Sequence, residues 1–271
     1  CAVPADAPGV LYVYGRQASD TRKLEGGCID VGNAEFGGHE AVIIFNDVFV
    51  PWEWVFMCGT EHRSGETAYA GELVELFAAH HRASYGGCKV GVGDVLIGAT
   101  QALARVQGTE NAAHIKDKIV EMIHLNETLY ACGIAASAEG VPTPCGTYRV
   151  DMLLANITKL NVTRFPYQIA SLAQDIAGGL LGTLPSEKDF NHPEIGALLE
   201  KYLVGNAKYP TQWRQRLLRL IENLTLGAGA VGYLVESMHG AGSPMAQRIM
   251  LARLADLEGK ERQALKIAGL Q

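Results

Sequence analysis

The stretch that decides the fold covers residues 73–94 and reads LVELFAAHHRASYGGCKVGVGD. Leu73, Leu76, Phe77 and His80 follow one another at spacings of three and four residues, the period of an amphipathic helix. Similar stripes recur further along the chain, at Ile115, Ile119, Met122, Ile123 and Leu129, and at Trp213, Leu217, Leu220, Ile221 and Leu224. From about residue 65 onward the sequence therefore predicts several long helices that pack together.

The residues before this helical region have the composition of β-strands. Val10–Tyr14, Ala41–Phe45 and residues 48–52 are runs of β-branched and aromatic residues. Three strands are too few for a complete barrel or sandwich, so we expect this part to finish a sheet begun elsewhere. We predict a mainly α protein of two domains, with the C-terminal part of a β domain at residues 1–62 and a helical bundle domain at residues 63–271.

Composition and charge exclude several classes of protein. The 271 residues are 48% apolar and include 31 glycines, which suits an enzyme that encloses a ligand. The net charge is -6 and the chain has no block of lysine or arginine, so we expect neither nucleic acid nor a membrane as a partner. None of the six cysteines forms a C-x-x-C pair, and no secretory signal is recognised, so we expect a cytoplasmic protein with reduced thiols.

Four reactive side chains share one face of the predicted helix. His81, Tyr85, Cys88 and Lys89 stand at positions i, i+4, i+7 and i+8. A histidine or cysteine alone is usually a packed core residue, but four reactive groups on one stripe make that interpretation less favourable. His81 and Cys88 are separated by about 10 Å of helix rise, which is too far for one metal ion, whereas an iron–sulfur cluster spans such a gap. The pair is interpreted as half of a cluster site whose other half is not recognisable in this sequence.

Two carboxylates and one helix end are further candidates. Glu40 and Glu236 are either ordinary solvated acids or, if buried beside a cluster or a thioester, acid–base groups with a raised pKa. Gln174, Gly178 and Gly179 lie at a predicted helix end, where backbone amides reach a phosphate or simply form a C-cap.

Six segments carry a resemblance to a known family: HRASYGGCKVGVGD (81–94), YGRQ (14–17), DTRK (20–23), HLNETLY (124–130), DIAGG (175–179) and ESMHGAGSP (236–244). They resemble the 4-hydroxybutyryl-CoA dehydratase/vinylacetyl-CoA isomerase family, and the likeness runs from about residue 1 to the C-terminus. The resemblance implies the fold of acyl-CoA dehydrogenases: this chain would be the tail of the middle β domain followed by the C-terminal four-helix bundle.

The resemblance also implies cofactors and an assembly. Family members are homotetramers with FAD and a four-iron–four-sulfur cluster held by three cysteines and one histidine, and His81 and Cys88 match two of those ligands. The other two come from a C-x-x-x-C motif that nothing here matches, so we expect an N-terminal domain or a partner chain to carry it. Glu40 and Glu236 match active-site glutamates, and Tyr85 and Lys89 match residues beside the cluster and the thioester. Gln174, Gly178 and Gly179 are the expected FAD-binding residues.

The implied reaction is the dehydration of 4-hydroxybutyryl-CoA to crotonyl-CoA, with isomerisation of vinylacetyl-CoA. It breaks an unactivated β C–H bond, which a carboxylate alone does not do, and the resemblance implies a radical mechanism that depends on flavin and the cluster. Two alternatives remain open: a flavin-dependent aromatic monooxygenase of the 4-hydroxyphenylacetate hydroxylase type, and a non-catalytic helical subunit. In the first of these, His81 and Cys88 would be packing residues.

Overall fold

The N-terminal part of the protein is a two-stranded antiparallel ribbon. Strand β1 (Val10–Tyr14) pairs with β2 (Ala41–Phe45), as their composition predicts. Val13 lies opposite Val42, and the two residues are 55% and 65% exposed. The ribbon therefore buries little apolar surface by itself. The structure, a computed structural model, describes residues 1–14, 41–58 and 66–270.

The third predicted strand, at residues 48–52, does not form, and that prediction was wrong. Residues 48–50 have no regular structure, and Trp52–Trp54 make a short 3₁₀ turn, η2, in which the Trp54 N–H donates to the Pro51 carbonyl at 3.0 Å. Pro51 has a fixed φ and no N–H, so it interrupts a strand ladder and favours this turn.

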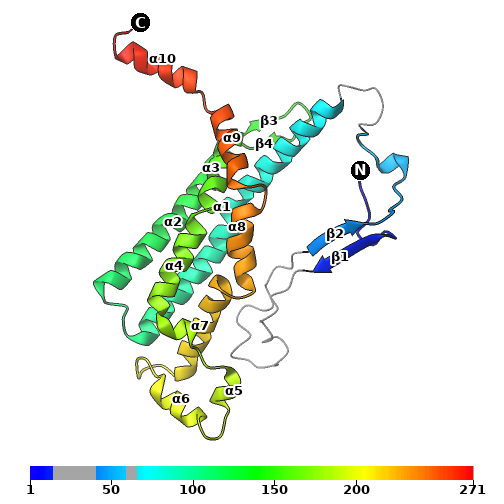
Figure 1. The fold of residues 1–271 in the computed structure, drawn as a ribbon. Coiled ribbons are helices and arrows are strands. Elements are labelled where there is room, and N and C mark those ends of the chain that lie inside the picture. Colours follow the sequence, from blue (N-terminus) through cyan, green and yellow to red (C-terminus); the bar gives the residue numbers. More distant parts are fainter. Residues whose placement is uncertain (15–40, 59–65, 271) are drawn as a thin grey trace.

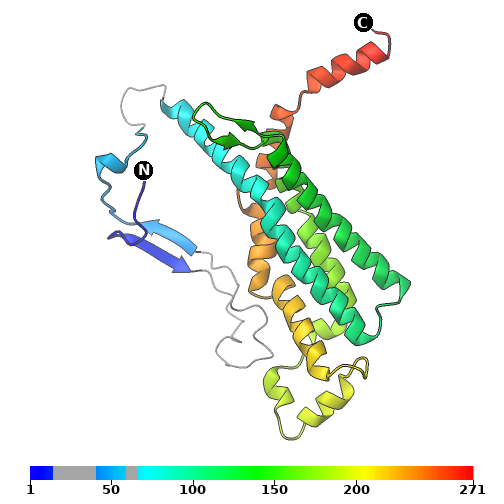
Figure 2. The same ribbon diagram turned by 180° about the vertical axis from the view of Figure 1, so that it is seen from behind.

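From Glu66 onward the chain forms an up-and-down bundle of four helical rods (Figure 1). The first two rods are single helices, and the third and fourth are each broken into segments. Seen from behind, the first two rods run side by side along the bundle (Figure 2). The rods are α1 (Glu66–Gln107); α2 (Ala113–Ala138); α3 (Met152–Val162) with α4 (Phe165–Ala177); and α7 (Thr211–Thr225) with η4 (Val231–Val235), α8 (Glu236–His239) and α9 (Pro244–Leu254). The predicted mainly helical fold is confirmed.

Short elements connect the rods at both ends of the bundle (Figure 1). A small hairpin joins the second and third rods, and three short helices join the third and fourth. The last helix projects away from the bundle. No helix in the described part of the chain has the length and apolarity needed to cross a bilayer. The short elements are β3 (Val141–Pro142), β4 (Tyr148–Arg149), η3 (Gly179–Gly182), α5 (Glu187–Phe190), α6 (Gly196–Tyr202) and α10 (Leu257–Ile267).

The predicted apolar stripes of α2 and α7 contribute to the core, although Ile123 and Trp213 of these stripes are 44% and 53% exposed. Met122 of α2 and Ile221 of α7 are 0% exposed and belong to one core cluster that also receives side chains from α1 and α4. At the start of α1, in contrast, Leu73 and Phe77 are 56% and 68% exposed. The helical period of this first stripe was predicted correctly, but its burial was not, because no other element of the described residues covers it.

A close contact between two glycines sets the spacing of the first two rods. A Cβ atom added at Gly86 of α1 would lie 2.6 Å from the Gly133 Cα atom of α2. Since carbon atoms do not approach this closely, α1 and α2 pack with their backbones in contact. This contact fixes α1 in the region that carries His81, Tyr85, Cys88 and Lys89.

We expect Gly86→Ala to destabilise the protein by about 1–3 kcal/mol, because the added methyl group forces two backbones apart. The matched control is Gly98→Ala on the same helix, where an added Cβ meets no atom within 4 Å. This control should be stabilising by about 0.5–1 kcal/mol, through helix propensity. Urea unfolding of both variants measures the difference, and equal stabilities would contradict the close packing.

Candidate active site

A lysine, a tyrosine and a glutamate meet inside the bundle. The Lys89 Nζ atom donates to Glu236 Oε2 at 2.8 Å, and Tyr85 Oη contacts Glu236 Oε1 at 3.5 Å. Lys89 and Tyr85 are 5% and 1% exposed, while the Glu236 side chain keeps 34% of its surface accessible. A carboxylate held by a buried ammonium group on one side and open on the other is placed to exchange a proton with a bound molecule.

The local structure of two helices builds this cluster. Tyr85 and Lys89 lie four residues apart on α1, so they project from the same face. Glu236 is the first residue of α8 and directly follows η4, a single π-helical turn. Such turns occur frequently at functional sites because the extra residue changes where side chains point. Lys89 Nζ also donates to the Gly232 carbonyl of η4 at 2.7 Å, which links α1 to this turn.

The predicted stripe divides into a buried and an accessible part. His81 is half-buried and stacks on Tyr85 with ring centroids 5.2 Å apart and an interplanar angle of 14°. Cys88 is exposed, and the pKa of its thiol is raised because nearby protein atoms reduce its hydration. The two residues are therefore not core residues of the bundle in the described structure. Tyr85 and Lys89, in contrast, are buried against the fourth rod.

The donor set of His81 and Cys88 suits part of an iron–sulfur site. An imidazole and a thiol stand on the accessible side of one continuous helix, and metal binding deprotonates such a thiol. Within residues 1–14, 41–58 and 66–270, no group of three or more His, Cys, Asp and Glu side chains is arranged to hold a metal ion. Any cluster held here would need further ligands from other residues.

Polar residues around the Lys89–Glu236 pair were missed by the sequence-based prediction. Lys159 of α3 is 0% exposed, and its Nζ atom donates to the Ser237 carbonyl. Burial, followed by the positive charges of Lys89 and Arg82, lowers the pKa of Lys159 to about 8, against a smaller opposing effect of Glu236. Lys159 is the only charged residue of α3, and a single charge in such a segment is the sequence signal that could have identified it.

Arg82 holds the loop that follows α8. Its Nε atom donates to the Ala241 carbonyl at 3.0 Å, and Nη1 donates to Asn156 Oδ1 at 2.8 Å. In the same loop, a Cβ atom at Gly240 would lie only 2.1 Å from Tyr85 Oη. The GAG sequence of this loop therefore allows the backbone to approach the tyrosine hydroxyl.

The remaining predicted site residues lie elsewhere. Glu40 lies outside the described residues. Gln174 and Gly178 are at the C-terminal end of α4, where the Gly178 N–H donates to the Gln174 carbonyl at 2.9 Å. Gly178 has φ 74°, and neither Gly178 nor Gly179 has a neighbour within 4 Å of an added Cβ. This end is thus a C-cap with an open backbone.

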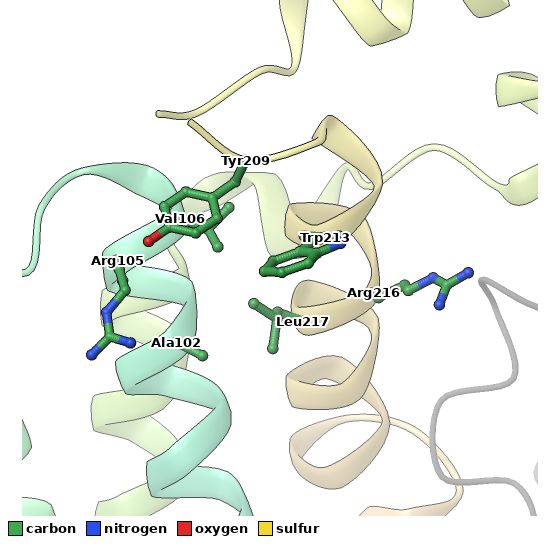
Figure 3. Close-up of a pocket in the computed structure, with 7 residues that line it drawn as sticks. All are labelled: Ala102, Arg105, Val106, Tyr209, Trp213, Arg216 and Leu217. Atoms are coloured by element: carbon green, nitrogen blue, oxygen red, sulfur yellow. The ribbon is translucent and has the colours of Figure 1, made fainter. Parts of the chain in front are cut away.

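A groove of about 440 Å³ lies between the C-terminal end of α1 and α7, away from the Lys89–Glu236 pair. Figure 3 shows the residues that line it. Tyr209 and Trp213 form one wall, with ring centroids 5.7 Å apart. Arg105 is also part of the lining and forms an ion pair with Glu110 at 3.0 Å. Tyr85 and Arg105 are separated by roughly 30 Å of helix rise, so this groove is no part of the Lys89–Glu236 site.

Two family models match the chain. The model described as 4-hydroxyphenylacetate 3-hydroxylase C terminal matches residues 70–269, and the corresponding N-terminal model matches residues 1–57. The 4-hydroxybutyryl-CoA dehydratase/vinylacetyl-CoA-Delta-isomerase of Clostridium aminobutyricum is 53% identical over 279 residues, covering 100% of this chain and 56% of that protein. The resemblance identified in the sequence is confirmed.

Solved structures of the dehydratase and of the hydroxylase also match the fold of the chain. An oxygen-tolerant archaeal 4-hydroxybutyryl-CoA dehydratase from N. maritimus matches with a TM-score of 0.93 and 56% identity, over 99% of this chain and 52% of that one. The oxygenase component HpaB of 4-hydroxyphenylacetate 3-monooxygenase, complexed with FAD, matches with a TM-score of 0.80 and 28% identity, over 98% and 55% of the two chains. An acyl-CoA dehydrogenase from Slackia heliotrinireducens shares the fold at a TM-score of 0.52. The chain spans about half the length of the relatives it matches.

Proposed function

Because the chain belongs to the 4-hydroxyphenylacetate 3-hydroxylase family, we propose that its protein is the member that dehydrates 4-hydroxybutyryl-CoA to crotonyl-CoA and isomerises vinylacetyl-CoA. The observation that carries this proposal is the 53% identity to the Clostridium dehydratase over the whole chain. The Lys89–Glu236 pair supports it, since the reaction needs a positioned proton acceptor. We further propose a cytoplasmic homotetramer.

The proposed cofactors are FAD and a four-iron–four-sulfur cluster. His81 and Cys88 would supply two of the four cluster ligands, and a C-x-x-x-C motif in an N-terminal domain or partner chain would supply the others. When bound, the flavin supplies one-electron chemistry and the cluster supplies a Lewis-acidic iron near the departing hydroxyl group. The open backbone at Gly178 and Gly179, with Gln174, is the proposed contact to FAD.

The residues of the chain itself would handle the protons. Glu236 is the proposed base, and Lys89 keeps its carboxylate oriented through Oε2. Tyr85 and Lys89 are the proposed donors to the leaving hydroxyl oxygen, and His81 is the alternative base. Glu40 is proposed as the partner acid or base. Dehydration removes one hydrogen and one hydroxyl group as water, so the overall conversion is redox-neutral.

A flavin-dependent aromatic hydroxylase is the second candidate. It is favoured by the name of the matching family and by the FAD-complexed hydroxylase of similar fold. In that function His81 and Cys88 would have no cluster to bind. Their accessibility on α1 and the lower identity of 28% make this candidate the weaker one.

An activity assay of the full-length protein, purified without oxygen, separates the candidates. We expect formation of crotonyl-CoA from 4-hydroxybutyryl-CoA, together with bound iron, sulfide and FAD. Hydroxylation of 4-hydroxyphenylacetate with reduced flavin and oxygen, without bound iron, would establish the hydroxylase instead. Absence of both activities from a protein with all cofactors bound would overturn the proposal and favour a non-catalytic subunit.

A further inference from the structure

A fully buried lysine lies beside the proposed site but has no role in the chemistry described above. Lys159 is 0% exposed on α3. Removing an ammonium group from water is costly, and a methionine would fill a similar volume without that cost. The contacts of its charged end therefore call for an explanation.

The ammonium group of Lys159 connects three rods of the bundle. It extends from α3, donates to the Ser237 carbonyl on α8, and lies 4.9 Å from the ring centroid of Tyr85 on α1. Lys89 Nζ lies 5.0 Å from the centroid of the same ring. Lys159 thus contacts the proposed reacting side chain of Tyr85 directly. It also binds the backbone of Ser237, the residue next to Glu236.

The accepting carbonyl is one that the helix leaves without an internal partner. Helix α8 ends at His239, so the carbonyls of its last residues lack the usual i+4 donors. The Gly240 N–H donates to the Glu236 carbonyl at 2.7 Å, and Lys159 Nζ donates to the next carbonyl, that of Ser237. A cation at a helix C-terminus is also favoured by the helix dipole.

Two lysines from different rods therefore anchor the backbone on both sides of Glu236. Lys89 binds the carbonyl of Gly232, and Lys159 binds the carbonyl of Ser237, five residues later. This interval contains most of the π-helical turn that precedes Glu236.

We propose that Lys159 is a positioning residue, whose buried ammonium group fixes the backbone at Ser237 and the ring of Tyr85 and so holds the Glu236 carboxylate in place. The role in turnover rests on the function proposed above, whereas the role in fixing the backbone does not.

The charge state of Lys159 is compatible with this role. The groups that face it are Lys89 and Arg82 from α1 and Glu236 from α8, and with its pKa lowered to about 8 the amine is mostly protonated at neutral pH. Because the unfolded lysine titrates at about 10.5, the unfolded state binds more protons between these two values, and this group makes the fold more stable as pH rises through that window. A loss of turnover there would not result from unfolding caused by Lys159.

The test compares three variants of the full-length holoenzyme: Lys159→Met, Lys159→Arg and, as a control, Lys116→Met at an exposed site on α2. In Lys159→Met we expect amide hydrogen exchange of residues 231–240 to become faster by about tenfold or more. We expect kcat to fall by about 10- to 100-fold while KM changes less than about threefold, as for a lost alignment. Lys159→Arg should retain more of the rate and lose less of it between pH 7 and 9 than the native enzyme. Lys116→Met should match the native enzyme throughout.

Native exchange and native kcat in Lys159→Met would overturn the proposal. If Lys159→Met does not fold, Lys159→Arg decides: protected exchange in residues 231–240 supports the proposal, and exchange as fast as in the unfolded chain overturns it. If the native protein has no dehydratase activity, the exchange measurement still tests the anchoring. Failure of the proposed function is then distinguished from failure of this inference.

Discussion

Replacing Cys88 by alanine is expected to remove nearly all dehydratase activity from the full-length protein. The exposed thiol of Cys88 is one of the two proposed cluster ligands on α1. Loss of a Lewis acid that contributes several kcal/mol to the transition state corresponds to a rate decrease of about 1,000-fold or more. The crotonyl-CoA formation rate and the iron and sulfide content of anaerobically purified protein measure the effect.

The matched control is Cys145→Ala, which removes another exposed cysteine, in the β3–β4 hairpin. It should retain the native rate and a complete cluster. The same comparison extends to His81→Ala, which should lose iron as Cys88→Ala does. If Cys88→Ala kept its full rate and its full iron content, the ligand assignment would be wrong.

The second large effect is expected for Glu236→Gln. Glutamine has nearly the shape of glutamate but does not accept a proton at neutral pH, so kcat should fall by about 100- to 10,000-fold with a much smaller change in KM. Steady-state kinetics of the holoenzyme measure both constants. Glu121→Gln on α2, which removes an exposed carboxylate near His124, is the control and should leave both constants unchanged.

A double variant separates the chemical effect from the structural one. Glu236→Gln leaves the buried ammonium group of Lys89 without its counter-charge, so the single variant should also be less stable. Adding Lys89→Met removes that charge and should recover part of the stability, the remainder being lost with the bond to the Gly232 carbonyl, without recovering the rate. Recovery of turnover in the double variant would show that Glu236 acts only through its ion pair and not as a base.

The candidate site was predicted only in part from the sequence. The spacing of His81, Tyr85, Cys88 and Lys89 placed them on one helical face, and α1 has them there. Neither the spacing nor the composition indicated which of the four are buried. Lys89 and Glu236 are 147 residues apart in the chain, so the sequence named each as a candidate but no local pattern paired the two.

By itself the sequence determined the local structure: strands at residues 10–14 and 41–45, long helices from about residue 65, and the helical face that carries the reactive groups. These depend on backbone preferences and on side-chain periods that extend over a few residues. The tertiary structure alone decided that Lys159 meets Ser237 and that Lys89 meets Glu236 across different rods. It also decided that Leu73 and Phe77 remain exposed. Burial and ion pairing depend on which helices come together in space, and that information is not contained in any short stretch of the chain.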